Sequence, residues 1–127
     1  ALKLKELAYV HAEGYPAGEM KHGPLALIEE GMPVVVIAPR DEHYKKTISN
    51  MQEVISRGAK VLLITNKSTD EIYSENIWEQ IEVDAISDEL IPFLTTIPLQ
   101  KLAYYSALDK GYDIDKPRNL AKSVTVE

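Results

Sequence analysis

Cysteine is absent from the 127 residues of this chain. Without a thiol, the chain can form no disulfide bond, no thiolate metal site and no cysteine nucleophile. A protein without disulfides also suits a reducing compartment, so we expect it to reside in the cytoplasm.

Long hydrophobic runs are missing as well. A membrane-spanning helix needs about 20 consecutive apolar residues. Runs such as VVVIA (34–38) and VLLI (61–64) are far shorter, and no secretory signal pattern precedes them. Their β-branched content instead predicts short buried strands.

Positive charge is in the minority, with 14 Lys and Arg against 20 Asp and Glu and a formal net charge of −6. An acidic surface repels the phosphates of nucleic acids and the headgroups of anionic lipids. We therefore expect neither nucleic acid nor a membrane among the partners.

Glycine-rich phosphate loops are not found either, since neither GxGxxG nor GxxxxGK(S/T) occurs. ATP and dinucleotides are therefore disfavoured, and we expect no cofactor.

The length suits one domain over residues 1–127, with a C-terminal segment from about residue 112. The first residue is alanine, and ALKLKELAYVHAE has a helical pattern with no cap before it, so we expect a fragment of a longer protein.

The spacing of apolar residues predicts an alternation of helices and strands. We expect helices at 2–13, about 41–57 and about 87–110, a helical stretch ending at Gly31, and strands at 32–39, 59–66 and 77–83. Asp41 is expected to cap the second long helix, and Pro98 to kink the third. STDEIYSEN (68–76) is expected to be an acidic loop.

The second long helix has the clearest pattern. Tyr44, Ile48, Met51 and Ile55 recur at steps of four, three and four, which places them on one face, and Gly58 suits the C′ position after the helix. A strand, a helix and a strand with continuous apolar strands predict a right-handed parallel βαβ unit. The expected fold class is α/β, a three-layer α/β/α sandwich with a small parallel sheet.

Three histidines are present. His43 is expected to be solvated, and His11 to be packed on a helix face, where it cannot pair with Glu13 as a metal ligand. We expect no metal site. His22 stands in MKHGP, between a lysine and a Gly-Pro break; it is either a solvated residue or a proton carrier held by a rigid loop.

A carboxylate and two lysines also permit two interpretations each. Glu6 lies three residues after Lys3, so the pair is either a surface ion pair or part of a site that moves a proton next to a carbonyl. Lys122, among small residues near the C-terminus, is either a solvated lysine or an amine that condenses with a sugar carbonyl.

Two stretches, HAEGYPAGEMKHGPLALIEEGMPVVVIAP (11–39) and DKPRNLAKSVTVE (115–127), closely resemble the glucosamine-6-phosphate synthase family, the glutamine:fructose-6-phosphate amidotransferases. The resemblance is to the second sugar-isomerase (SIS) domain of the isomerase half, a flavodoxin-like fold. It extends over the whole chain and is weakest from about Asn66 to Val83. It implies part of an aminotransferase and isomerase that makes glucosamine 6-phosphate and glutamate from fructose 6-phosphate and glutamine, the first step of amino-sugar biosynthesis.

The resemblance also implies roles for individual residues. Lys122 matches the lysine that forms a Schiff base with the opened sugar, and Glu6 matches the glutamate that moves the proton between C1 and C2. Lys3 matches a lysine near the same proton transfers, and Ala121 a backbone contact to the sugar. His22 matches the histidine that assists ring opening in a neighbouring subunit's site, which implies a homodimer.

Parts of the family's machinery are not found in this sequence. The glutaminase half uses an N-terminal cysteine, and the sugar phosphate is held by a Ser/Thr-rich loop in the preceding SIS domain. We therefore expect upstream SIS and glutaminase domains in the same protein, and little activity from this chain alone. The alternatives are a non-catalytic sugar-phosphate-binding or dimerisation module and a different sugar-phosphate isomerase with this fold.

Overall fold

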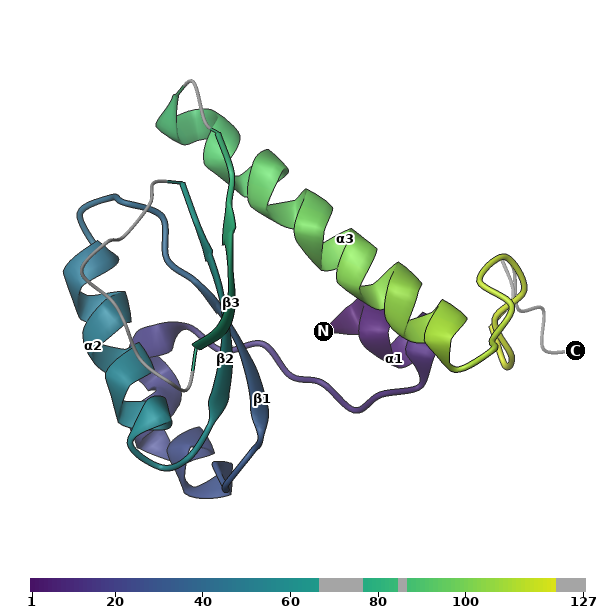
Figure 1. Ribbon diagram of the computed structural model, residues 1–127, viewed down its shortest axis with the longest axis horizontal. Coiled ribbons are helices and arrows are strands. Elements are labelled where there is room, and N and C mark those ends of the chain that lie inside the picture. Colours follow the sequence, from purple (N-terminus) through teal and green to yellow (C-terminus); the bar gives the residue numbers. More distant parts are fainter. Residues whose placement is uncertain (67–76, 85–86, 121–127) are drawn as a thin grey trace, which may run out of the picture. The chain divides into compact units, whose positions relative to one another are not determined.

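The computed structural model describes residues 1–66, 77–84 and 87–120. The chain divides into two compact units, one formed by Ala1–Gly14 with Ile97–Glu127 and the other by Tyr15–Thr96. Helices and strands follow in this order, with η denoting a 3-10 helix: α1 (Leu2–Ala8), η1 (Ala17–His22), η2 (Pro24–Leu27), β1 (Pro33–Ile37), α2 (Tyr44–Ile55), β2 (Lys60–Thr65), β3 (Ile77–Glu82), η3 (Asp88–Leu90) and α3 (Ile91–Asp109) (Figure 1).

The sheet of the second unit contains three parallel strands in the order β1-β2-β3 among the described residues. Val34 lies opposite Val61 and Val36 opposite Leu63, so these four residues share one face. The parallel β1–α2–β2 arrangement confirms the predicted βαβ unit and the α/β class. No helix in the described part of the chain is long and apolar enough to span a bilayer.

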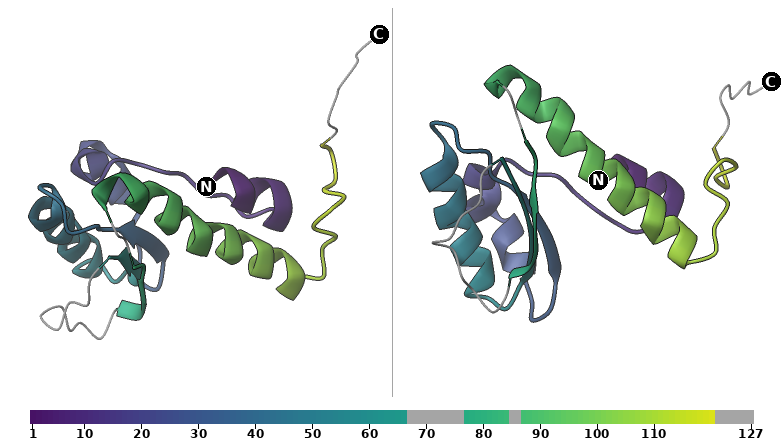
Figure 2. Two further views of the ribbon diagram at one scale, coloured as in Figure 1. Left: turned by 90° about the horizontal axis from the view of Figure 1, so that it is seen from above. Right: turned by 45° about the horizontal axis from the view of Figure 1, so that its top comes forward.

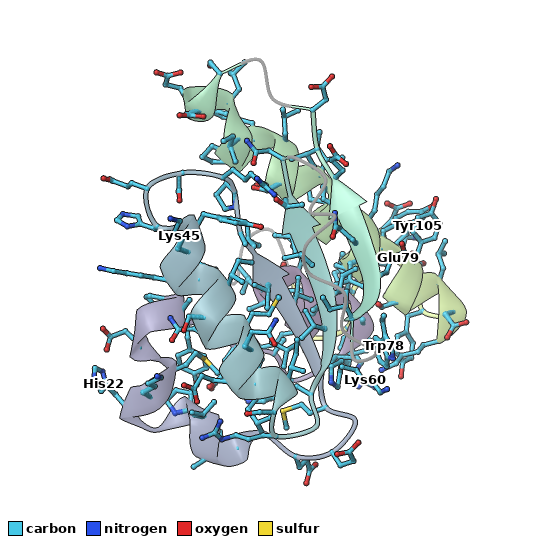
Figure 3. The ribbon with its side chains drawn as sticks, turned by 60° about the vertical axis from the view of Figure 1, so that its left-hand side comes forward. His22, Lys45, Lys60, Trp78, Glu79 and Tyr105 are labelled. Carbon is cyan, nitrogen blue, oxygen red and sulfur yellow. The ribbon has the colours of Figure 1, made fainter. Side chains whose placement is uncertain are left out.

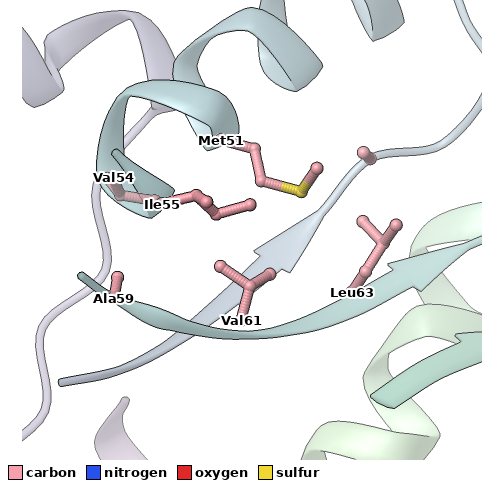
Figure 4. Packing of buried hydrophobic residues seen from close by; sticks show 7 residues of the cluster. Met51, Val54, Ile55, Ala59, Val61 and Leu63 are labelled. Atoms are coloured by element: carbon pink, nitrogen blue, oxygen red, sulfur yellow. The ribbon is translucent and has the colours of Figure 1, made fainter. Parts of the chain in front are cut away.

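The core of this unit is the contact between α2 and that face of the sheet. Met51, Val54 and Ile55 of α2 are buried against Val61 and Leu63 of β2 (Figure 4). Ile48 and Tyr44, about one and two turns before Met51 on α2, are partly buried against the same cluster. The predicted apolar stripe of α2 is therefore confirmed, as is the buried strand β2.

The prediction that residues 32–39 form a fully buried strand is wrong. Val35 and Ile37 are 37% and 41% exposed, and burial alternates along β1. The reason is its place in the sheet. Within the described strands β1 is at the edge, and α2 covers only the face of Val34 and Val36.

Strand β3 occupies the opposite end of the strand order, in agreement with its predicted place near an edge. Its register with β2 shifts by one residue: Val61 lies opposite Ile77, but Leu62 lies opposite Glu79. Trp78 is the extra residue of this irregularity, and its side chain is 59% exposed (Figure 3).

Several predicted helix boundaries are wrong. The first helix ends at Ala8 rather than at residue 13, because Tyr9 takes left-handed backbone angles (φ 53°, ψ 37°) that stop helical hydrogen bonding. The stretch before Gly31 is two short 3-10 helices, since Gly23 (φ 141°) and the proline after it interrupt the chain.

Helices α2 and α3 also differ in detail from the prediction. Helix α2 begins at Tyr44, and the Asp41 carboxylate instead accepts a hydrogen bond of 2.8 Å from the backbone N–H of His43, in the turn before the helix. Helix α3 begins at Ile91 and continues through Pro98, where the expected kink stays a prediction. The acidic loop at 68–76 lies outside the described residues.

Glycines end both long helices, and the one after α2 is the glycine that the sequence predicts. The N–H of Gly58 bonds to the Ile55 carbonyl and that of Ala59 to the Val54 carbonyl, which is the hydrogen-bond pattern of a Schellman motif with Gly58 at C′. Gly111 closes α3 with the same pattern. Both glycines have positive φ, 90° and 70°.

The short helix η1 is attached to α2 by charge as well as by packing. The Lys21 ammonium bonds to the Glu53 carboxylate at 2.9 Å, and Arg57 bonds to the other Glu53 oxygen at 3.2 Å. Met20 packs against the core cluster beside this pair. The hydrogen bond from Lys21, followed by that from Arg57, lowers the pKa of the Glu53 carboxyl below its ordinary value of 4.5.

Replacing Gly58 with alanine should be costly for two separate reasons. First, the backbone at position 58 has the positive φ that residues with a Cβ rarely adopt. Second, an added Cβ would lie 2.9 Å from the Cα of Glu30 and would also clash with the Glu30 carboxylate. We expect Gly58→Ala to lower the free energy of unfolding by roughly 2 to 5 kcal/mol. The matched control is Gly111→Ala, where nothing lies within 4 Å of a Cβ and the expected loss is about 1 to 2 kcal/mol. Urea denaturation measures both, and equal losses would contradict the role of Glu30.

The Glu53 carboxyl should titrate differently when Lys21 is removed. We expect Lys21→Met to raise the pKa of Glu53 towards 4.5, and Arg57→Met to raise it less, since Lys21 has the larger effect. Because the pKa is lowered on folding, the stabilisation is present above the unfolded-state pKa and is lost as the pH falls through the folded-state pKa. Carbon-detected NMR titration of the Glu53 carboxyl checks this, and an unchanged pKa in Lys21→Met argues against the ion pair.

Candidate active site

Helix α1 holds a lysine and a glutamate together. The Lys3 ammonium lies 2.6 Å from a Glu6 carboxylate oxygen, one turn apart on the same helix face. Lys3 is 61% exposed, whereas Glu6 is 25% exposed. The predicted ion pair is therefore confirmed, and the carboxylate is mostly shielded from solvent with a cation beside it. The role of Glu6 as a base is untested.

The end of α1 contacts the C-terminal segment within the first unit. The guanidinium of Arg118 lies 3.9 Å above the centre of the Tyr9 ring, and the backbone N–H of Arg118 donates a 2.8 Å hydrogen bond to the Tyr9 hydroxyl. The Tyr112 ring meets Tyr9 edge-on, with centroids 4.8 Å apart. Tyr9 thus binds the C-terminal segment in three ways: its ring face contacts the Arg118 guanidinium, its ring packs edge-on with Tyr112, and its hydroxyl accepts the Arg118 N–H.

The same end of α1 is joined to α3. The Lys110 ammonium donates a hydrogen bond of 3.3 Å to the backbone carbonyl of Ala8, one of the helix-end carbonyls that have no partner within α1. Ala8, Ala103 and Ala107 are fully or almost fully buried, and their small side chains allow helices to approach closely. Helix α1 lies beside the C-terminal part of α3 (Figure 2).

The segment between Tyr112 and Arg118 is folded by a local turn. The Asp113 carboxylate accepts hydrogen bonds from the backbone N–H groups of Asp115 and Lys116, at 2.9 and 3.1 Å. Asparagine 119 has a φ of 61°, a conformation that asparagine tolerates better than most residues. The predicted site residues Ala121 and Lys122 come directly after this segment and lie outside the described residues.

His22 ends η1 in the second unit and projects outwards from it (Figure 3). Its Nδ1 lies 2.8 Å from a carboxylate oxygen of Glu19, and both side chains are exposed. Residues three apart eclipse one another on a 3-10 helix, which explains this close pair. Because the carboxylate can only accept, the pair favours a proton on Nδ1 and leaves Nε2 for another partner.

The other two histidines are surface residues. His43 is 70% exposed as predicted. The prediction that His11 packs on a helix face is wrong: α1 ends before it, its side chain is 83% exposed, and its Nε2 lies 3.6 Å from Glu13. Among the described residues, no group of three or more His, Asp or Glu side chains could hold a metal ion.

Sequence reasoning did not find three of the residues that organise these sites. Glu19 precedes His22 by three positions, a spacing that pairs side chains on a helix, but the sequence does not predict the 3-10 helix η1 that places them together. Tyr9 and Arg118 are 109 positions apart, and no local pattern relates them.

Comparisons with known proteins agree with the resemblance read from the sequence. The chain is 55% identical over all 127 residues to the proteins named glutamine–fructose-6-phosphate aminotransferase (isomerizing) from Brucella abortus biovar 1 (strain 9-941) and Aquifex aeolicus (strain VF5), and it spans about a fifth of their length, 21% of each.

Two solved structures have the same fold. One is the C-terminal domain of glucosamine-fructose-6-phosphate aminotransferase from Francisella tularensis, with a TM-score of 0.85 and 49% identity, covering 91% of this chain and 32% of that one. The other is glucosamine-6-phosphate deaminase from Thermotoga maritima, with a TM-score of 0.71 and 30% identity, covering 99% and 35%. Together with the small parallel sheet, these matches confirm the predicted three-layer α/β/α class.

The family model described as the SIS domain matches residues 1–109, from the start of α1 to the last residue of α3. That match covers both the βαβ unit and the helix that holds Lys3 and Glu6. The chain belongs to the SIS domain family.

Proposed function

We propose that this chain is the isomerase-domain part of an enzyme that converts fructose 6-phosphate and glutamine to glucosamine 6-phosphate and glutamate. Relatives with that name are 55% identical over its full length. One observation carries the proposal: Arg118, four residues before Lys122, is bound to Tyr9, three residues after Glu6. The chain leading to the proposed nucleophile is thus attached beside the proposed base.

Chain geometry makes cooperation between Lys122 and Glu6 feasible. Four residues span at most about 14 Å when fully extended. Three residues along an α-helix rise about 4.5 Å, so Glu6 is less than one turn from the point where Arg118 is bound. An amine at the end of a long lysine side chain falls within this reach.

The proposed reaction begins with the Lys122 amine adding to the C2 carbonyl of the open sugar and releasing water to form an imine. Ammonia derived from glutamine then replaces the lysine at C2. Glu6 removes a proton from C1 to give an enolamine and returns a proton to C2, while the C1 hydroxyl becomes the aldehyde. Lys3, already beside Glu6, stabilises the negative charge that develops during these transfers.

Ring opening precedes these steps and is proposed for His22. Ring opening moves a proton from the anomeric hydroxyl to the ring oxygen. The free Nε2 of His22, with the imidazole oriented by Glu19 through Nδ1, can take that hydroxyl proton and return it to the ring oxygen. We propose that it does so in a second copy of the chain, so that a homodimer is the active form. Ala121 is proposed to contact the sugar through its backbone.

The whole enzyme is proposed to be larger than this chain. The relatives are about five times as long, and this chain has no cysteine with which to hydrolyse glutamine. We propose that residues 1–127 form one SIS domain with a C-terminal segment from about 112. It works with further SIS and glutaminase domains in the cytoplasm and has little activity alone.

A second candidate function comes from the match to a protein named glucosamine-6-phosphate deaminase. That match has the lower identity, 30% against 49% for the aminotransferase domain. A deaminase or a purely sugar-binding module would have no need of Lys122, so the lysine separates the alternatives.

Lys122→Arg should abolish covalent trapping of the sugar. In the complete protein that contains this chain, borohydride with fructose 6-phosphate should reduce the imine and add the sugar to Lys122, which peptide mass spectrometry locates. Arginine keeps the charge but forms no Schiff base, so trapping should be lost and sugar binding retained. The control is Lys116→Arg in the same segment. Trapping at another lysine, or none in the unaltered protein, would sink the proposed role.

Glu6→Gln should slow the isomerisation without removing the side chain's volume. Loss of a positioned general base typically costs a factor of about 100 to 10,000 in rate. We expect kcat to fall by that order while imine trapping at Lys122 continues, because Glu6 acts after the imine forms. The control Glu42→Gln changes an exposed acid in the second unit. Normal turnover in Glu6→Gln would exclude Glu6 as the base.

A further inference from the structure

Tyr9 has an unfavourable backbone conformation for a residue with a side chain. Its φ of 53° and ψ of 37° lie in the left-handed region, which glycine enters freely and an aromatic residue enters rarely. Gly58 and Gly111 fill the comparable positions after α2 and α3. Non-glycine residues stay in this region when their surroundings hold them there, and such residues concentrate at functional sites.

The left-handed turn lets the side chain of Tyr9 bind the C-terminal segment. The backbone N–H of Tyr9 and that of Val10 both bond to the Leu4 carbonyl, which closes α1. The ring then lies under the Arg118 guanidinium at 3.9 Å and its hydroxyl accepts the Arg118 N–H at 2.8 Å. A glycine at position 9 would close the helix equally well but would provide neither contact.

Two chain connections meet at this helix end. Lys110, at the end of α3, bonds to the Ala8 carbonyl, and Arg118 bonds to Tyr9. The residues between them are folded on the Asp113 carboxylate and packed by the Tyr112 ring against Tyr9. The chain that follows α3 is therefore fixed to the end of α1 as far as Arg118.

We propose that Tyr9 is a positioning residue: it attaches Arg118 to the end of α1, and so limits how far Lys122, four residues later, can lie from Glu6 when it reacts. The claim that Tyr9 affects catalysis rests on the function proposed above. The anchoring of Arg118 by Tyr9 is a separate claim that can be tested without any activity.

The first test is hydrogen exchange at the Arg118 amide in the complete protein, resolved by fragmentation mass spectrometry. Tyr9→Phe keeps the ring and removes the acceptor, so the amide should exchange about fivefold faster. Tyr9→Leu removes the ring as well, and exchange should be roughly tenfold faster or more. The matched control is Tyr105→Phe, which removes a hydroxyl from an exposed tyrosine of the same unit.

The second test separates positioning from general stability. In Tyr9→Phe, kcat and the rate of imine trapping at Lys122 should fall several-fold while KM for fructose 6-phosphate and the melting temperature stay close to those of Tyr105→Phe. A merely structural role would lower stability without this selective change in kcat.

The outcomes are distinguishable. Arg118 exchange in Tyr9→Phe that matches Tyr105→Phe overturns the anchor, whatever the activity. Faster exchange with unchanged kcat and trapping overturns the positioning role. Faster exchange in a protein whose unaltered form never traps sugar at Lys122 supports the anchor and overturns the proposed function instead.

Discussion

The first unit depends on the way α1 ends. A seven-residue helix is too short to be stable alone, so its position is decided by what its last residues contact. Ala8 offers a carbonyl to Lys110, and Tyr9 offers its ring and hydroxyl to Arg118. Two basic residues beside the negative end of the helix are also electrostatically favourable. The order of the C-terminal segment therefore depends on a few polar contacts rather than on a large apolar core.

The parts of the fold that depend on a regular pattern of apolar residues, or on glycine at a helix end, could be predicted from sequence. The face of α2 with Met51 and Ile55 has the helical period, and β2 is continuously apolar because it is the central strand. Helix ends at Gly58 and Gly111 follow from the freedom of glycine at positive φ. Each of these features is decided by neighbours in the sequence.

Most of what sequence reasoning missed is decided by distant partners. The exposure of Val35 follows from the place of β1 at the edge of the described strands, which its apolar sequence does not reveal. No local sequence pattern predicts that α1 ends at Tyr9. The left-handed conformation of Tyr9 accompanies its contacts with Arg118, which is 109 positions away. Of the candidate site, Lys3 and Glu6 were paired correctly because a helix fixes their spacing. Glu19, the nearby partner of His22, is the exception, since it was missed because the sequence does not predict the 3-10 helix η1 that pairs the two side chains.

The proposed chemistry also explains why its residues need not belong to one unit. Ring opening is complete before the imine forms, so His22 and Lys122 act in successive steps. Each compact unit then holds a complete local pair for its own step: His22 with Glu19 in one, and Glu6 with Lys3 in the other. The Lys122 amine and the Glu6 carboxylate are proposed to act in turn on neighbouring carbons of the same bound sugar, so both must reach that sugar. Among the described residues, Tyr9 ties the segment before Lys122 to the helix of Glu6 through its hydrogen bond to Arg118 and its ring contacts with Arg118 and Tyr112, all within a single unit.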